Sequence, residues 1–228
     1  MIFITGDTHG LIDINKLYAF SKAHPELTKS DYMIIAGDFG GVWSKKSLES
    51  DLDFYGRLPF TVLFVDGNHE NFDLLESYPI EQWKGGKVHK IRPDIIHLMR
   101  GQVFEIEGKT FFAFGGATSI DKAFRREGES WWSRELPTYG ELEEGITNLK
   151  KYGNKIDFII THSCDERALW YPPLLTRTNK KDVYTENQLL TYFEENITYG
   201  HWYFGHYHID GQLNPEKTAL YENIVRLI

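Results

Sequence analysis

The stretch Gly67-Asn68-His69-Glu70 follows an apolar run that extends from Phe60 to Val65. Six apolar or β-branched residues in succession predict a buried strand. The Asn and the His therefore come at the end of that strand. Polar side chains at strand ends in an α/β sheet are typical of ligand and metal sites. This stretch thus predicts both the fold class, α/β, and the place of a functional site.

Four other stretches repeat this arrangement, because each places an Asp or a His beside a glycine or at the end of an apolar run. We predict that all five stretches converge on one metal site. The four are residues 5–10 (TGDTHG), 36–40 (AGDFG), 161–162 (TH) and 205–208 (GHYH).

The first half of the chain alternates strand and helix patterns. Two further apolar runs, 2–5 and 32–36, end at a glycine as the run at 60–65 does. Helical spacing between the runs predicts βαβ units, with parallel strands whose carboxyl ends lie on one side. Asp13 is expected to cap the first helix, whose apolar face would use Leu17.

The second half is less regular. Short runs between 87 and 116 predict an antiparallel meander with a tight turn at 107–109. The spacings Thr138-x-x-Glu141 and Thr185-x-x-Gln188 predict two capped helices, and 156–161 predicts another buried strand. We expect one domain over 1–228 with irregular loop insertions near 117–137 and 165–183, and long loops in a compact domain are more often functional than idle.

Composition narrows the class of protein. The 228 residues carry a formal net charge of −8, which makes nucleic acid unlikely as a stable partner because such binding relies on Lys and Arg. The single cysteine, Cys164, excludes an internal disulfide, and the first residues lack a charged and apolar leader, so a cytoplasmic location is expected. No apolar segment reaches the roughly 18 to 20 residues that cross a bilayer. Oligomeric state is not encoded in any of these features.

The candidate ligands are two Asp, one Asn and four His, in a chain with 9 His. Carboxylate, imidazole and amide oxygen without thiolate favour Mn²⁺, Fe, Zn²⁺ or Co²⁺. Seven ligands exceed what one tetrahedral ion needs, so two ions bridged by a carboxylate would use them all. The seven are Asp7, His9, Asp38, Asn68, His162, His206 and His208.

At these residues the sequence resembles the calcineurin-like metallophosphoesterase superfamily. The motifs Asp-x-His, Gly-Asp, Gly-Asn-His-Glu, a lone His after a strand, and Gly-His-x-His occur in that order from Asp7 to His208. The resemblance implies a four-layer αββα sandwich of two mixed β-sheets flanked by helices, with a dinuclear metal centre. It also implies hydrolysis of a phosphomonoester or phosphodiester by attack of a metal-bound water or hydroxide.

The resemblance also implies a role for each residue. Asp38 would bridge the two ions, and Mn²⁺ is favoured. His69 would not bind metal but would protonate the leaving group or hold the phosphate, and Glu70 would support an imidazole. Gly67 would let the chain turn out of its strand. One ion would be held by Asp7, His9, Asp38 and His208, and the other by Asp38, Asn68, His162 and His206.

The sequence departs from the serine/threonine protein phosphatases of this superfamily, because the stretch Gly37-Asp38-Phe39-Gly40-Gly41-Val42 lacks the Asp-Arg that follows Gly-Asp in those enzymes. A small-molecule or nucleotide-type substrate is therefore favoured. Two alternatives stay open: a serine/threonine-type protein phosphatase, and a non-catalytic metal-binding scaffold of the same fold.

A phosphate-binding side chain that replaces the missing arginine would come from the irregular loops. Arg125 and Arg126 are the first candidates for substrate binding, since Arg forks hold phosphate bidentately. The later loop adds Arg167, Arg177 and 180–181 (KK). In the competing interpretation the tryptophans of the first loop seal a minor core and its charges are solvated.

The remaining candidates have ordinary explanations. Cys164 is expected to be a small buried thiol rather than a nucleophile, and Tyr207 to orient the two flanking histidines. The other histidines are expected to be structural, exposed or at a helix end: His24, His89, His97 and His201.

Overall fold

Three parallel strands, β1 (Ile2–Thr5), β2 (Tyr32–Ile35) and β3 (Thr61–Phe64), form the centre of a seven-stranded sheet in this computed structural model, which describes residues 1–176, 178 and 183–228. All residues of β1 and β3 are buried, as expected for parallel strands covered on both faces. The predicted βαβ units are confirmed. The sheet order is β13-β1-β2-β3-β6-β5-β4, with β4 (Ile80–Trp83), β5 (Gly86–Arg92), β6 (Ile95–Leu98) and β13 (Val225–Arg226).

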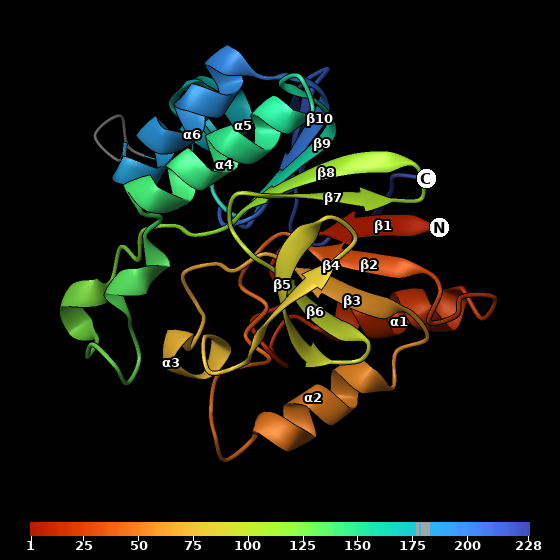
Figure 1. Cartoon of the computed structure of the whole chain (residues 1–228). Coiled ribbons are helices and arrows are strands. Elements are labelled where there is room, and N and C mark those ends of the chain that lie inside the picture. The colour runs from red at the N-terminus through yellow and green to blue at the C-terminus, as the bar shows by residue number, and fades with distance from the viewer. Residues whose placement is uncertain (177, 179–182) are drawn as a thin grey trace.

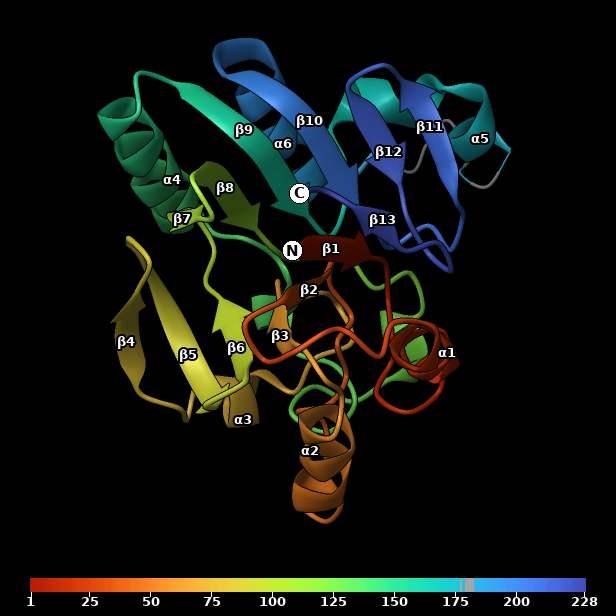
Figure 2. The same ribbon diagram turned by 90° about the vertical axis from the view of Figure 1, so that its right-hand side faces the viewer.

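A second sheet of six strands packs against the first (Figure 2). Its strands β8, β9, β10 and β12 are parallel, and the edge strands β7 and β11 are antiparallel to their neighbours. The order is β11-β12-β10-β9-β8-β7, with β7 (Gln102–Ile106), β8 (Lys109–Phe114), β9 (Lys155–Thr161), β10 (Thr198–Phe204), β11 (Gly211–Asn214) and β12 (Lys217–Ala219).

The predicted single meander is wrong, because its strands belong to different sheets. The chain leaves the first sheet after β6 and enters the second at β7, so the strands within 87–116 form two separate antiparallel pairs, β5–β6 and β7–β8. All four residues of β6 are buried and β6 pairs in parallel with β3. A pattern of short apolar runs does not reveal this, since it does not say which sheet each run joins. The turn between β7 and β8 is confirmed by the positive φ of Glu107 and Gly108.

Helices cover the outer face of each sheet, which gives the expected four-layer αββα arrangement of an α/β protein (Figure 1). The first sheet carries α1 (Asn15–Ala23), α2 (Leu48–Gly56) and the short α3 (Phe72–Leu75). The second carries α4 (Tyr139–Lys151), α5 (Pro172–Leu175) and α6 (Thr185–Asn196). None of the helices within the described residues is long and apolar enough to cross a membrane.

Alternation along the strands divides the interior into three cores. Ile2 and Ile4 face the second sheet, whereas Phe3 between them faces α1 and packs with Leu17. The third core lies between the second sheet and α4 and α6. The two sheets are thus held face to face by apolar packing, which fixes the strand ends of one sheet relative to those of the other.

One of the two predicted capping boxes is confirmed. Thr138 caps α4, and Glu141 completes the box by accepting the Thr138 N–H. The box predicted at 185–188 is wrong, because α6 begins one residue earlier, at an N-cap of Tyr184, whose N–H donates to Oδ1 of Asn187. Asn187 thus takes the role predicted for Gln188, with the donor one residue earlier in the chain.

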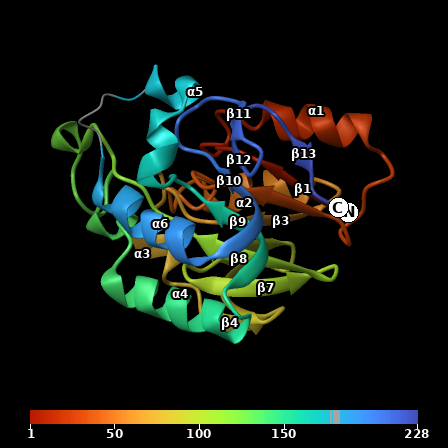
Figure 3. The ribbon, with the colours of Figure 1, turned by 90° about the horizontal axis from the view of Figure 1, so that it is seen from above.

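The two irregular loops contain short helical turns. Residues 117–137 hold η1 (Lys122–Phe124) and η2 (Ser133–Glu135), and this loop projects at the left of Figure 1. The later loop holds η3 (Glu166–Trp170) and α5. Its predicted basic residues Arg177, Lys180 and Lys181 lie outside the described residues. The two chain ends lie side by side in Figure 3, where the Ile2 N–H donates to the Ile228 carbonyl.

Candidate metal centre

The polar stretches of the sequence meet where strands of both sheets end. Asp7 follows β1, Asp38 follows β2 and Asn68 follows β3, whereas His162 and His206 follow β9 and β10 of the second sheet. Parallel strands deliver these side chains to one edge of each sheet, and the packing of the two sheets brings the edges together.

Two glycines allow the strand ends to approach closely. A β-carbon on Gly67 would lie 2.0 Å from Oδ1 of Asp38, and one on Gly205 would lie 2.2 Å from Oδ1 of Asp7. The backbone of Gly67 does not have a left-handed φ. The chain bends directly after Gly67, and the missing side chain of this residue makes room for a carboxylate.

Asp38 lies between two histidines. Its Oδ2 is 3.2 Å from Nε2 of His9, and its Oδ1 is 3.3 Å from Nε2 of His162. Oδ1 of Asn68 is 3.2 Å from the same His162 nitrogen. The two oxygens of one buried carboxylate thus face two separate groups of potential ligands.

One carboxylate oxygen of Asp7 is buried and placed where a cation could bind it. Its Oδ1 accepts the backbone N–H of His206 at 2.9 Å. Among the described residues its buried Oδ2 accepts no hydrogen bond of ordinary geometry, although Nε2 of His208 lies 3.2 Å away. An uncompensated buried carboxylate oxygen is costly. A divalent cation between Asp7 and His208 would satisfy it, and the oxygen and imidazole donors suit such an ion.

Hydrogen bonds at Nδ1 leave Nε2 of two histidines free to bind a cation. Nδ1 of His162 lies 2.8 Å from the Ala36 carbonyl, which can only accept, so Nδ1 carries the hydrogen and Nε2 is free to bind. Nδ1 of His9 lies 2.6 Å from Oδ2 of Asp13 with the same effect. Asp13 therefore does not cap α1 as predicted, since the N-cap is Ile14.

Ligand atoms gather in three groups with spacings below 4.8 Å. One contains His69 together with His9 and Asp38, so this histidine lies as close to the site as the proposed ligands do. The groups share members and form one continuous cluster. They are Asp7, His9 and His208; His9, Asp38 and His69; and Asp7, Asp38 and His162.

The electrostatics of the cluster favour positive charge. Burial opposes charging of His162 and His9, yet the neighbouring Asp38 and Asp7 raise the pKa of His162 to about 10 and that of His9 to about 9. Burial likewise opposes ionisation of Asp38, but His162 and His9 hold its pKa well below the ordinary value. Two buried carboxylates thus attract cationic charge, which protons or metal ions can supply.

Four of the predicted ligands adopt a left-handed backbone conformation. The φ values are 44° for His9, 47° for Asp38, 68° for His206 and 50° for His208. Residues with a β-carbon rarely adopt this region, and such strain clusters at functional sites. These backbone conformations therefore reduce stability at the positions that direct the four side chains into the cluster.

Comparison with known proteins identifies the family. The calcineurin-like phosphoesterase family matches residues 1–210. This chain belongs to that family. A lariat debranching enzyme of Schizosaccharomyces pombe (strain 972 / ATCC 24843) is 27% identical over 177 residues, which are 70% of this chain and 35% of that protein. The chain thus spans about a third of the length of this curated relative.

Solved structures show a more distant likeness. A putative 5'-nucleotidase from Staphylococcus aureus has a TM-score of 0.49 and 14% identity, over 96% of this chain and 48% of the other. The phosphopantetheinyl hydrolase of Mycobacterium tuberculosis has a TM-score of 0.46 and 14% identity, over 96% and 87%. Membership of the calcineurin-like phosphoesterase family implies divalent metal ions, and the clustered Asp and His side chains could hold them.

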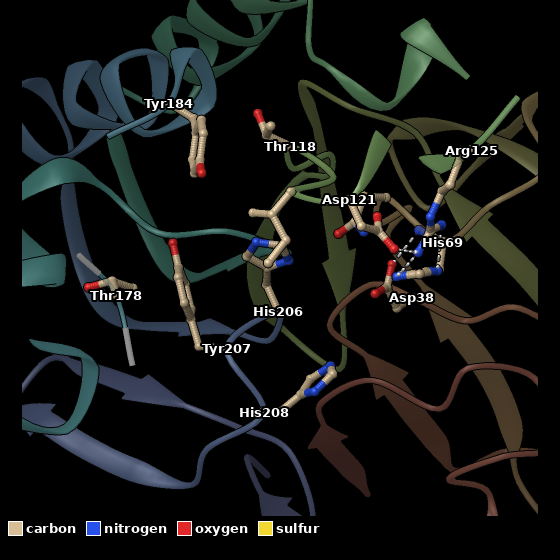
Figure 4. A pocket seen from close by; sticks show the side chains of 12 residues that line it. Asp38, His69, Thr118, Asp121, Arg125, Thr178, Tyr184, His206, Tyr207 and His208 are labelled. Atoms are coloured by element: carbon tan, nitrogen blue, oxygen red, sulfur yellow. Dashed lines mark hydrogen bonds and ion pairs between the residues drawn. The ribbon is translucent and has the colours of Figure 1, made fainter. Parts of the chain in front are cut away.

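A pocket of about 420 Å³ opens over the cluster of this calcineurin-like phosphoesterase (Figure 4). Arg125 reaches into it and lies against His69, with Nη1 3.3 Å from Nδ1 and Nη2 3.4 Å from Nε2. Asp121 pairs with Arg125 at 2.7 Å. Tyr184 and Tyr207 lie on the side of the pocket opposite Arg125 (Figure 4). A guanidinium and an imidazole thus stand beside the cluster at the entrance to the pocket.

Arg126 points elsewhere. Its side chain is 82% exposed, it does not line the pocket, and it pairs with Glu129 at 3.8 Å. The neighbouring Trp132 is buried and packs edge-on against Trp43 at 5.6 Å. Both interpretations of the loop therefore hold in part, because a tryptophan seals a minor core while one arginine reaches the pocket.

Glu70 does not support an imidazole, so that expectation is wrong. Its carboxylate accepts the backbone N–H groups of Phe39 and Gly40, at 2.7 and 3.3 Å. These two groups belong to the turn after Asp38, and no strand partner satisfies them there. Glu70 thus holds the loop that carries Asp38.

The other expectations for single residues give mixed results. Cys164 is buried, and burial raises the pKa of its thiol, as expected for a structural cysteine. Tyr207 packs edge-on against His206 with ring centres 4.9 Å apart. His97 and His89 are buried and bonded to each other, with Nδ1 atoms 3.0 Å apart. His201 lies 2.9 Å from the Thr218 hydroxyl, so all three histidines have structural contacts.

Several residues that hold the site in place were not predicted from the sequence. Nζ of Lys16 donates to the carbonyls of Asp7 and Gly6, at 2.6 and 3.2 Å. Ser119 accepts from the side chain of Asn68 at 3.3 Å. A lysine on an amphipathic helix and a serine in a loop carry no signal of such roles, since their partners are distant in sequence.

Proposed function

We propose that this chain binds two divalent ions, Mn²⁺ favoured, and hydrolyses a phosphomonoester or phosphodiester of small-molecule or nucleotide type. The observation that carries the proposal is the placement of Asp38, whose two oxygens face His9 and His162 separately. A carboxylate in that position suits a bridge between two ions. Asp7, His9 and His208 would complete one site, and Asn68, His162 and His206 the other.

When bound, such ions lower the pKa of coordinated water and neutralise charge on the phosphoryl group. The chain supplies the remaining functions. The fork of Arg125 can hold two phosphoryl oxygens, because it already points into the pocket beside the cluster. His69 is placed to donate a proton to the leaving group or to hold the phosphate.

The dimensions of the pocket support a small substrate. A volume of about 420 Å³ suits a mononucleotide-sized molecule better than a folded protein surface, and Tyr184 and Tyr207 offer aromatic faces on its far wall. The residues after Asp38 also lack the arginine of the serine/threonine phosphatases. A small phosphorylated substrate is thus the first candidate and a phosphoprotein the second.

The test combines metal content with turnover. Purified protein, dialysed against Mn²⁺, should bind two ions per chain and hydrolyse p-nitrophenyl phosphate or bis-p-nitrophenyl phosphate, while the variant Asp38→Asn should lose bound ions and turnover. A phosphopeptide assayed in parallel tests the protein phosphatase alternative. Bound ions without turnover on any of these substrates would favour a non-catalytic scaffold, and folded protein without ions would refute the metal centre.

A further inference from the structure

The side-chain amide of Asn68 can face the cluster in two orientations, and only one of them allows it to bind a metal ion. Its amide presents an oxygen that can bind a cation and an NH₂ group that cannot. The two ends have nearly the same shape, so neighbouring hydrogen bonds decide which one faces the cluster. In the structure Oδ1 faces Nε2 of His162, and Nδ2 points away from the cluster to Oγ of Ser119.

A buried carboxylate fixes the polarity of Ser119. Oγ of Ser119 lies 2.7 Å from Oε2 of Glu135, and the Ser119 N–H donates to Oε1 of the same residue at 2.8 Å. A carboxylate only accepts, so the serine hydroxyl hydrogen goes to Glu135. The serine lone pairs then face Asn68, which must present its N–H.

We propose that Ser119 and Glu135 are positioning residues that hold the Asn68 amide with its oxygen toward the metal. This inference rests on the proposed function, since it requires Asn68 to be a ligand. All three side chains are buried: Asn68 is 5% exposed, Ser119 2% and Glu135 0%. Water therefore does not substitute for a lost partner at low cost.

The segment that carries Ser119 is itself firmly held. The preceding residue, Thr118, donates from its N–H and its hydroxyl to the buried carboxylate of Glu186, at 3.0 and 2.8 Å. Glu135 comes from η2 and Glu186 from α6. Burying two carboxylates is unfavourable unless they are well bonded. Two such anchors on consecutive residues fix the serine oxygen at a defined place beside Asn68.

The first test measures Mn²⁺ binding by equilibrium dialysis with the full chain. Ser119→Ala should lower the affinity for one of the two Mn²⁺ ions by about 10- to 100-fold, which is the usual effect of losing a residue that orients a ligand. The affinity for the other ion should be unchanged. Ser119→Thr keeps the hydroxyl and should bind both ions. The matched control is Thr110→Val. Thr110 lies at the opposite end of β8, and its N–H and hydroxyl likewise donate to a carboxylate, that of Asp157.

A second variant reverses the polarity without removing an atom. In Glu135→Gln the amide oxygen must stay opposite the Ser119 N–H, so its NH₂ group faces the serine oxygen. The serine hydrogen then turns to Asn68 and attracts Oδ1, which rotates the amide away from the metal. We expect the same ion to weaken as in Ser119→Ala, although a mere anchor of the loop would be nearly unaffected by this change.

A third comparison separates orientation from general damage. In an Asn68→Asp background both side-chain oxygens can bind metal, so the added change Ser119→Ala should alter Mn²⁺ affinity by less than about threefold. The proposal is overturned if Ser119→Ala and Glu135→Gln both bind two ions like the parent, or if Ser119→Ala weakens binding equally in both backgrounds. A parent protein without bound ions would refute the proposed function itself, whereas loss confined to the variants would not.

Discussion

The guanidinium of Arg125 lies alongside the imidazole of His69, with its two terminal nitrogens 3.3 and 3.4 Å from the two ring nitrogens. Two cations are not stable in this arrangement. Burial lowers the pKa of His69, Asp38 opposes the shift, and Arg125 lowers it further. The pair therefore places a permanent positive charge next to a neutral imidazole, which still carries one N–H donor, above the cluster.

Replacement of Arg125 should separate substrate binding from metal binding. We expect Arg125→Ala to lower kcat/KM by about 10²-fold, the loss typical for one charged donor in an active site, and Arg125→Lys to recover only part, because lysine lacks the planar fork. Metal content should stay at the parental value. Arg126→Ala is the informative comparison: a larger loss there than at Arg125 would contradict the assignment of the pocket arginine.

Replacement of His69 tests whether it acts on substrate. His69→Ala should retain both ions and lose about 10² to 10⁴ in turnover, since general acid catalysis contributes that much. Metal analysis of the purified variant is the measurement. Because His69 lies in one group with His9 and Asp38, loss of an ion would instead make it a ligand.

The sequence carried the information that lies within single runs of residues. Asp7, Asp38 and Asn68 each follow an apolar strand, so their convergence followed from parallel pairing. Which sheet a strand joins was not predictable, because β6 and β7 have similar patterns and only packing separates them. The hydrogen-bond partner of a side chain was also predicted wrongly where two suitable partners compete for it.

Asp13 shows this competition clearly. An Asp before a helix is a good cap, but here a histidine of the metal cluster is the partner. Ser119 and Glu135 represent the opposite case, in which a contact 16 residues apart leaves no local signal. Such contacts depend on how a loop folds back on the sheet.

Asp66 should contribute strongly to stability. It is buried and accepts from Nε and Nη2 of Arg100, at 2.8 and 2.5 Å. Asp66→Asn should reduce the free energy of unfolding by about 3–5 kcal/mol, as expected when a buried pair loses one partner. Urea denaturation measures this. Asp53→Asn, which breaks a pair with Arg92 at the surface, should cost at most about 1 kcal/mol.

The same pair predicts an acid dependence. Burial raises the pKa of Asp66, but Arg100 and His97 outweigh it and hold the pKa below the ordinary value. Its stabilisation is therefore complete above the unfolded pKa of about 3.9 and is lost as the pH falls through the lower folded value. The difference between the parent and Asp66→Asn should be constant from about pH 7 to 5 and shrink below about pH 4; a difference that falls already near pH 6 would contradict this assignment.

The left-handed ligands predict an unusual order of stabilities. Both His208→Gly and His208→Ala remove the imidazole, and the His208 side chain is 46% exposed. At φ 50° glycine is unstrained, whereas alanine retains the cost of about 1–2 kcal/mol of a left-handed residue. Metal-free His208→Gly should thus melt several degrees above His208→Ala. The reverse order, which is normal for Gly and Ala elsewhere, would show that no strain resides at this position.

The four left-handed residues of the proposed metal centre also have a consequence for how the protein is made. Each left-handed residue weakens the empty chain, and metal ions that bind only the folded form raise its stability by about 2.7 kcal/mol when present at a hundred times their dissociation constant. A nascent chain that meets no metal would then unfold and be degraded more often than one that does. The amount of this protein in a cell should therefore rise and fall with the metal supply during synthesis, independently of any control of its gene.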